Sequence, residues 1–245
     1  MKNIISLLVL ICSVGVIIVS CAKKSDTSST STDTSGAGTG MTASGTVTGD
    51  DNLTGIFNMS YFGQEPSGGC IDNSTAVAAF VTLSAIPSDT LAYKKQIIIT
   101  SSTTYTESMQ YYSDTSCATL TGYFNLLYAN FSVGDSLSGL SAGSNPAKPT
   151  TAKKVSYTHP SMNLKSNTDT TTAWFNSTLG SSSLATLGFK QGTELVIPIS
   201  TPESSVNIWE TSAMSGSSKT YLFTGSSATS TYPTGWTSAS VWWQE

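Results

Sequence analysis

The chain has 245 residues, a formal net charge of −4, 38% hydrophobic residues and 11% charged residues, and it contains 43 serines and 37 threonines. All eleven basic residues are lysine and His159 is the single histidine, which excludes an arginine-rich surface for nucleic acid and a zinc site built from several histidines. Five Trp, ten Tyr and eight Phe nevertheless indicate a folded core, because disordered chains are poor in aromatic residues.

The N-terminus has the pattern of an export signal. A start that contains Lys2 precedes an apolar run over residues 4–19, which at about 16 residues is shorter than the roughly 20 that span a bilayer. The run ends in Ile18-Val19-Ser20-Cys21, which resembles the lipobox of bacterial lipoproteins. An ordinary cleaved signal or an uncleaved anchor are the alternatives.

The lipoprotein resemblance implies a cut before Cys21 and attachment of membrane lipid to its thiol. Two or more acyl chains would hold the protein stably at a membrane, at about 0.8 kcal/mol per buried methylene. Ala22 follows the cysteine, in place of the Asp that retains some such lipoproteins at the inner membrane. We therefore expect residues 1–20 to be a signal peptide and the protein to be lipid-anchored in the cell envelope, at the outer membrane rather than the inner membrane.

Residues 21–52 have the composition of a flexible tether. They are almost wholly Ser, Thr, Gly, Asp and Lys, contain no aromatic residue, and cannot bury enough apolar surface to offset the entropy of ordering. About 30 such residues reach roughly 30 Å. The remaining residues 53–245 are long enough for one domain.

Four cysteines occur, of which Cys12 lies in the signal and Cys21 in the lipobox. Cys70 and Cys117 remain as a pair in an exported chain, which predicts a disulfide. Free thiols or a metal pair are the alternatives, and an exported setting disfavours them.

The pattern beyond residue 53 predicts an all-β domain. Phe57, Met59 and Tyr61 alternate with polar residues, and Tyr105, Met109 and Tyr111 share a strand face with Glu107. The further candidate strands are residues 76–83, 95–99, 122–131, 154–159, 194–199, 206–211, 220–224 and 241–244, with a hairpin connection at 100–104 and a long loop at 140–151. One helix is predicted over residues 170–179, with Asp169 as N-cap and Gly180 after its end. About ten short strands with polar turns predict an antiparallel barrel or a sandwich.

Two segments of the predicted domain are alike. Residues 53–61 return as residues 120–128, identical at six of nine positions, which indicates either two related β-meander units or a coincidence between two amphipathic strands. Gly55-Ile56-Phe57 and Gly122-Tyr123-Phe124 also resemble the Gly-x-Trp opening strand of lipocalins. That resemblance implies an eight-stranded barrel around a small apolar ligand. The chain departs from the family in having Phe for Trp and in lacking the Arg that packs over that Trp.

Motifs for catalysis are weak. Ser141 lies in a G-x-S-x-G match, but prolines follow where a nucleophile elbow needs a helix. His159 is the single histidine available as a base and precedes Pro160, which suggests the end of a strand. A hydrolase using Ser141 and His159 is therefore a minor hypothesis. We expect that the protein is not an enzyme and that it has no cofactor and no metal site.

Trp242 and Trp243 are adjacent in the last candidate strand, so one ring should face the core and the other outward. An outward Trp could stack on a glycan or anchor an extracellular protein, although a partly covered aromatic in a closing strand explains it equally. The sequence thus predicts a non-enzymatic binding or surface-interaction module. The alternative is a lipocalin-like carrier of a small hydrophobic ligand.

Overall fold

The computed structural model describes residues 41–60, 65–141, 147–178, 187–213, 217–236 and 240–244. These residues form one antiparallel sheet and three helical segments. The strands are β1 (Ile56–Met59), β2 (Ala92–Ile99), β3 (Tyr105–Tyr112), β4 (Leu120–Ser138), β5 (Thr151–Ser166), β6 (Leu195–Pro198), β7 (Ser204–Ala213), β8 (Thr220–Thr224) and β9 (Ser240–Gln244). The helices are the 3-10 turn η2 (Ser67–Gly69), α2 (Ser74–Thr82) and α3 (Asp169–Thr178).

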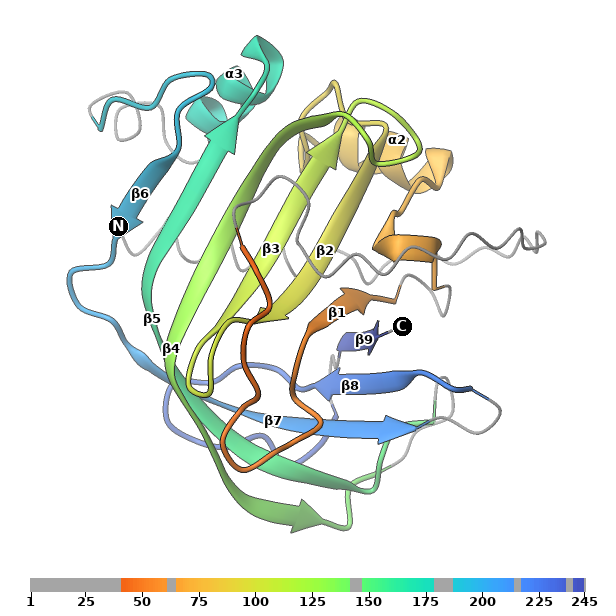
Figure 1. Cartoon of the computed structure of the whole chain (residues 1–245), viewed down its shortest axis with the longest axis vertical. Helices are drawn as coiled ribbons and strands as arrows, with labels where there is room; N and C mark the ends of the chain where they lie inside the picture. The colour runs from red at the N-terminus through yellow and green to blue at the C-terminus, as the bar shows by residue number, and fades with distance from the viewer. Residues whose placement is uncertain are drawn as a thin grey trace.

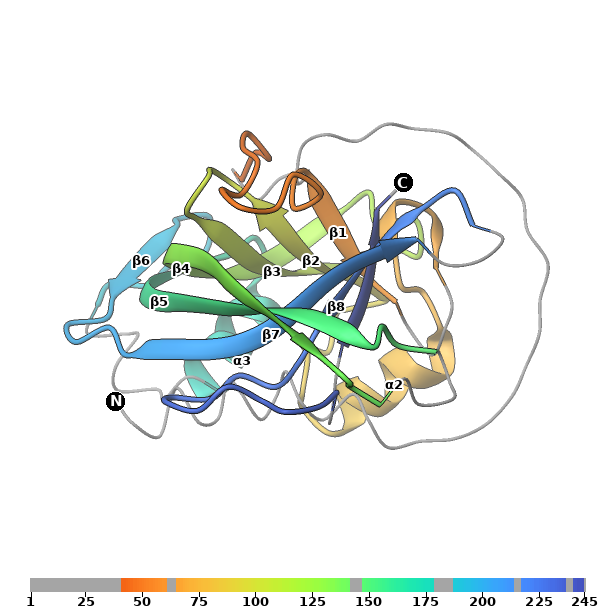
Figure 2. The same cartoon turned by 90° about the horizontal axis from the view of Figure 1, so that it is seen from below.

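The sheet closes into a barrel of eight strands. From β1 to β5 each strand pairs with the next, β5 continues to β7, β8 and β9, and β9 pairs back with β1. Figure 1 shows β2 to β5 running upright while β7 and β8 cross the lower part, and Figure 2 shows the same strands from below. The prediction of an all-β antiparallel domain is confirmed, and the architecture is the barrel and not the sandwich.

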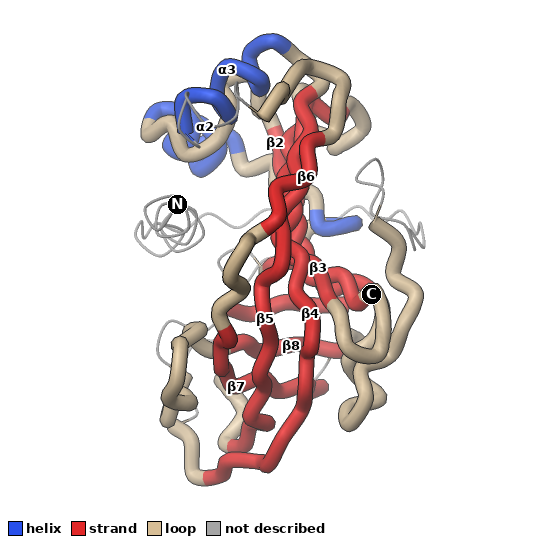
Figure 3. The backbone as a smooth tube through the Cα atoms, turned by 90° about the vertical axis from the view of Figure 1, so that its left-hand side faces the viewer, coloured by secondary structure: helices blue, strands red, loops and turns tan. Residues whose placement is uncertain are grey.

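The two longest strands, β4 and β5, extend along most of the molecule, with α2 and α3 at one end (Figure 3). The first half of β5 pairs with β7 from Lys153 to Thr158, and its second half pairs with β6 from Ser161 to Leu164. Pro160 lies at this change of partner, where the β4–β5 register also shifts. A proline is tolerated at such an irregularity because the ladder does not need its missing N–H. For this reason β5 continues beyond His159, where the sequence predicted its end.

The segment predicted as a strand over residues 76–83 is the helix α2, so that prediction was wrong. Asn73 caps it by accepting a hydrogen bond from the Ala76 backbone N–H at 3.1 Å. Its alanines favour a helix, and the local cap overrides the β-tendency of its Val and Thr residues. The second helix, α3, begins at Asp169, and Thr168 Oγ1 caps it by accepting from the Thr171 N–H at 3.1 Å.

The predicted helix over residues 170–179 is therefore confirmed with its cap one residue earlier than expected, at Thr168 and not at Asp169. Leu179 and Gly180, at its predicted end, lie outside the described residues.

Two apolar clusters fill the inside of the barrel. The upper cluster combines inward strand residues with the two helices, and the lower cluster lies between the β1–β4 and β7–β9 walls. The upper cluster consists of Ile71, Val77, Ile86, Tyr93, Tyr111, Phe124, Leu126, Met162, Leu164, Phe175 and Phe189. The lower cluster consists of Val47, Leu53, Phe57, Ile97, Ile99, Tyr105, Phe131, Val155, Tyr157, Trp209, Leu222 and Trp242. Met59 and Tyr128 pack against both.

Residues 41–52, which were predicted to be part of the tether, belong to the folded domain; residues 21–40 lie outside the described residues. Val47 is buried in the lower cluster, and the Ser44 backbone N–H donates to the Ile99 carbonyl at 3.2 Å. Asp50 forms an ion pair with Lys153 at 2.8 Å. The composition of this segment concealed its role, since the single Val47 supplies the core contact that distinguishes it from the preceding Ser/Thr-rich sequence.

The two similar segments have different backbone conformations. Gly55 precedes β1 with a φ of +77°, whereas Gly122 lies inside β4 without a positive φ. A side chain at Gly55 would collide with Gln244 of β9, and one at Gly122 would collide with Thr171 of α3. The absence of a side chain thus lets Gln244 pack against Gly55 and Thr171 pack against Gly122. This favours coincidence over a duplicated β-meander unit.

Cys70 and Cys117 form the predicted disulfide, with a sequence separation of 47. It joins the segment between η2 and α2 to the β3–β4 connection. In that connection Asp114 accepts backbone hydrogen bonds from Ser116, Ala118 and Thr119. These bonds, together with one from the Ser116 hydroxyl, hold the pKa of the Asp114 carboxyl well below its usual range.

Removing the disulfide should destabilise the domain without changing its architecture. Closing a loop of this length stabilises by about 4 kcal/mol in the chain-entropy model, and we expect the double variant Cys70→Ser/Cys117→Ser to lose roughly that much. Urea unfolding followed by tryptophan fluorescence measures the loss. The wild-type protein under reducing conditions is the control and should show the same midpoint, whereas an unchanged midpoint in both would contradict this contribution.

Candidate functional site

The inner face of the barrel carries polar groups between its two apolar clusters. Side chains alternate along a strand, so Lys95 shares the inward face of β2 with Ile97 and Ile99 of the lower cluster. Glu107 shares the inward face of β3 with Tyr105. We use the term waist for the inward residues at this level, which are Met59, Lys95, Glu107, Met109, Tyr128 and His159.

The pairing of the strands brings the waist residues together. Lys95 lies opposite Met109, and Glu107 lies opposite Ile97, so Lys95 and Glu107 are diagonal neighbours on β2 and β3. Met59 pairs with Trp242 across the β1–β9 seam. The six waist residues thus lie on β1 to β5, and closure of the barrel brings Trp242 of β9 beside Met59 and Lys95.

Lys95 and Glu107 do not form a direct ion pair. The ion pairs found among the described residues are Lys153 with Asp50 and Lys219 with Glu65, at 2.8 and 3.0 Å. Lys95 Nζ instead lies 5.4 Å from the centre of the Trp242 ring, within the range of a cation–π interaction. Both charges thus lack a charged protein partner at contact distance.

Burial shifts the titration of the polar waist residues. Desolvation raises the pKa of the Glu107 carboxyl, and the positive charge of Lys95 lowers it in part. Desolvation lowers the pKa of the His159 imidazole, against a backbone hydrogen bond to Ser161 that raises it. Both shifts favour the neutral forms of these two groups.

An aromatic wall surrounds the lower side of the waist. Tyr128 stacks on Tyr105 with ring centres 4.5 Å apart and on His159 at 5.0 Å. Tyr157 and Trp209 meet Tyr105 edge-on, at 5.6 and 5.0 Å. Burial raises the pKa of both Tyr105 and Tyr157, so these rings present neutral hydroxyls to the interior.

Two buried nitrogen atoms near this wall have no protein hydrogen-bond partner. His159 Nε2 and Trp209 Nε1 are both inaccessible and unpaired. Since the ring of His159 already interacts with the Ser161 backbone, its Nε2 is free to accept a hydrogen bond. Unpaired buried polar atoms are uncommon in proteins and require an explanation such as a water molecule or a ligand.

The waist retains accessible surface although it lies inside the barrel. All six waist residues are half-buried, whereas their inward neighbours Phe57, Ile97 and Trp242 are almost completely buried. A polar, partly accessible layer thus separates two apolar layers.

The predicted aromatic binding surface at Trp242 and Trp243 is not exposed, so that prediction was wrong. The two rings do face opposite sides of β9, but both are buried, with 2% and 0% of their surface accessible. Trp242 enters the barrel, and Trp243 enters a third cluster with Ile208, Phe223 and Trp236 on the outside of the barrel. Lys219 covers Trp243, with Nζ 4.0 Å from the ring centre.

The structure separates the residues of the hydrolase hypothesis. Ser141 follows the end of β4 in an exposed loop, while His159 lies eight residues into β5 from Thr151, about 26 Å along a strand. Cys21 and the rest of the lipobox lie outside the described residues. Cys70 and Cys117 form a disulfide at the surface of the domain and do not contribute to the waist.

Other features of the described residues offer less chemistry. One surface hollow of about 440 Å³ is lined by residues that include Thr48, Thr103 and Asn130, and another of about 330 Å³ includes Lys154 and Tyr232. Within the part of the chain that the structure describes, three or more His, Cys, Asp or Glu residues nowhere gather as a metal site would require. The described helices are all too short or too polar to cross a membrane.

Comparison of the sequence with family models and with curated proteins finds no match for the chain. One signal for the waist was present in the sequence, because Glu107 interrupts an otherwise apolar and aromatic face of β3. Lys95 gave no comparable signal, since its neighbour Lys94 made the pair look like the solvated start of a strand.

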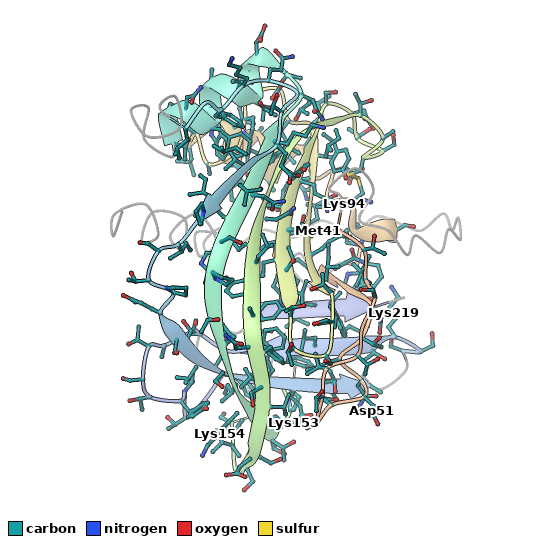
Figure 4. The ribbon with its side chains drawn as sticks, turned by 60° about the vertical axis from the view of Figure 1, so that its left-hand side comes forward. Met41, Asp51, Lys94, Lys153, Lys154 and Lys219 are labelled. Atoms are coloured by element: carbon teal, nitrogen blue, oxygen red, sulfur yellow. A yellow bond between two sulfur atoms is a disulfide. The ribbon has the colours of Figure 1, made fainter. Side chains whose placement is uncertain are left out.

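The pKa of Glu107 should respond to a change at the inward Lys95 and not to a change at the outward Lys94. Lys95→Met removes the charge that lowers this pKa, so we expect the Glu107 pKa to rise further in that variant. Lys94→Met is the matched control, because Lys94 lies on the opposite face of β2, near the Tyr112 ring (Figure 4), and should leave the value unchanged.

Carboxyl chemical shifts followed by NMR over a pH titration measure both values, with Glu107→Gln identifying the resonance. Equal shifts in the two lysine variants would show that Lys95 does not face Glu107.

Proposed function

We propose that this chain is a lipid-anchored, non-enzymatic binding protein of the bacterial cell envelope, and that its barrel binds a small molecule at the waist. The observation that carries the proposal is the presence of Lys95 and Glu107 on the inner face without a mutual ion pair. Taking the Lys95 ammonium away from water is unfavourable unless a partner compensates it, and burial raises the pKa of the Glu107 carboxyl. A ligand that interacts with these groups supplies the missing compensation.

The fold supports the same proposal. A closed barrel of eight strands provides an interior wide enough for side chains or for one small ligand. Here the clusters fill the upper and lower interior, and the polar waist lies between them. This arrangement agrees with the lipocalin-like alternative raised from the sequence. The hypothesis that Trp242 and Trp243 bind a glycan or an extracellular protein loses its support, because both rings are buried.

The envelope part of the proposal rests on the lipobox residues and on the Ser/Thr-rich sequence that follows Cys21. With folding now observed from residue 41, that sequence leaves about 20 residues between the lipid and the domain, a reach of roughly 25 Å. A barrel joined to the lipid by such a short segment would remain close to the membrane surface. Ala22 favours the outer membrane.

Cys21→Ser should release the protein from the membrane. The change removes the thiol that would carry the lipid, so we expect the chain to move from the membrane fraction to the soluble fraction and to lose its acyl mass. Cys12→Ser is the matched control, because that cysteine lies within the apolar run and should leave anchoring intact. Fractionation with mass spectrometry of the mature N-terminus measures both. A lipidated, membrane-bound Cys21→Ser chain would contradict the assignment.

The ligand itself should be detectable in protein isolated from its own cells. Native mass spectrometry of the wild-type chain should show a bound small molecule, and the double variant Lys95→Met/Glu107→Gln should lose at least about 10-fold in occupancy, as expected when charge-assisted contacts are removed. Lys94→Met should keep the ligand. Empty protein in every preparation, or equal occupancy in the waist variant, would contradict binding at the waist.

A further inference from the structure

We infer that the ligand of the waist is an amphipathic carboxylate, with its charged head at Lys95 and its hydrocarbon body against the apolar residues of the barrel. This inference rests on the proposed function, because it assigns the chemical class of the molecule bound there. Three observations point to this class: the charge balance of the waist, the polar groups around Glu107 and the residues that connect the two clusters.

The charge balance favours an anion over a cation. Among the described residues Lys95 has no acidic group within ion-pair distance, whereas Lys153, at the lower end of β5 (Figure 4), is paired with Asp50 at 2.8 Å. The Trp242 ring beside Lys95 stabilises the ammonium but donates no hydrogen bond to a ligand from its face. A carboxylate placed at Lys95 would form a charge-assisted hydrogen bond of the strong class. A cationic head would meet the Lys95 charge in a medium that screens it poorly.

The groups facing Glu107 are compatible with an anionic neighbour. They are Lys95 from β2, Tyr105 on the same strand, Tyr157 from β5 and, diagonally across the β3–β4 pairing, Tyr128, which stacks on His159. Burial favours the uncharged forms of Tyr105, Tyr157 and His159, as it does for Glu107 itself. When Glu107 is protonated, its hydroxyl can donate to the ligand carboxylate. The waist then holds one positive charge, on Lys95, to meet one negative charge.

The apolar part of the ligand has a defined environment. Met59 and Tyr128 pack against both clusters, and Met109 packs against the upper one, so the waist is continuous with apolar surface in both directions. Methionine side chains are unbranched and adapt to ligands of varied shape. The unpaired His159 Nε2 adds one acceptor, which a hydroxyl on the hydrocarbon body could use. These features predict a preference for the charged head group that is stronger than the preference for the shape of the body.

Three probes with the same alkyl chain test the head group: dodecanoate, dodecanol and dodecyltrimethylammonium, each below its micelle concentration. They are titrated into the chain carrying Cys21→Ser, which removes a competing acyl group, and binding is followed by calorimetry and tryptophan fluorescence. We expect dodecanoate to bind at least about 10-fold more tightly than dodecanol, as for a charge-assisted hydrogen bond. Dodecyltrimethylammonium should bind most weakly.

Variants separate this inference from the broader proposal. Lys95→Met should abolish the advantage of dodecanoate over dodecanol while leaving dodecanol binding unchanged, and Lys94→Met should alter neither. Dodecanoate affinity should fall as the pH rises through the Glu107 pKa, because the ionised carboxylate then repels the ligand. Glu107→Gln, which cannot ionise, should keep the affinity and lose that pH dependence.

The outcomes that overturn the inference are distinct. Equal binding of all three probes, or preference for the cation, would disprove an anionic ligand while supporting a binding barrel. Loss of dodecanoate binding in Glu107→Gln would show that the head group depends on the Glu107 carboxyl itself and would overturn the arrangement in which Lys95 makes the head-group contact. Failure of every probe, together with empty protein from cells, would disprove the proposed function itself.

Discussion

The short seam between β1 and β9 is the interaction on which the rest of the structure depends. It consists of the pairs Asn58 with Trp243 and Met59 with Trp242, extended by a hydrogen bond from the Ser60 N–H to the Val241 carbonyl at 2.8 Å. This seam joins the first strand to the last and turns an open sheet into a barrel. Without it, β2 and β3 would present their inward faces to water, and neither Lys95 nor Glu107 would be desolvated.

Closure also decides the environments of the two adjacent tryptophans. A strand places successive side chains on opposite faces, so Trp242 must enter the barrel when Trp243 lies outside it. The outside position is buried because Ile208, Phe223 and Trp236 gather there, on the outer faces of β7 and β8 and on the segment before β9. Large aromatic side chains on both faces of β9 therefore stabilise the short pairing between β1 and β9. The same packing removes these rings from the molecular surface.

The sequence predicted the strands well because they are rich in β-branched and aromatic residues and because their turns are polar. The strand predicted over residues 220–224 has the observed bounds of β8, and the hairpin at 100–104 forms with the Thr100 N–H bonded to the Thr104 carbonyl at 3.1 Å. The failures have local causes. Asn73 caps a helix whose apolar run reads equally as a strand, and Val47 alone marks folded sequence in a segment of tether-like composition.

The candidate site could not be predicted from the sequence, and the cause is different. An inward charge is recognised only when the face of its strand, the register to its neighbour and the closure of the sheet are all known. Glu107 could be placed on an apolar face from its alternation with Tyr105 and Met109. That Lys95 faces the same space depends on its pairing opposite Met109, and local periodicity does not contain that register.

The Gly-x-aromatic segment that resembles lipocalins acquires a specific explanation from the seam. Gly55 has a φ of +77° and lies against Gln244, whose Nε2 donates to the Thr54 carbonyl at 2.8 Å. A side chain at Gly55 would displace that contact, so the glycine allows the last strand to reach the first. Phe57, two residues later, is completely buried in the lower cluster. In this chain the segment therefore supports closure and fills one end of the barrel without an arginine.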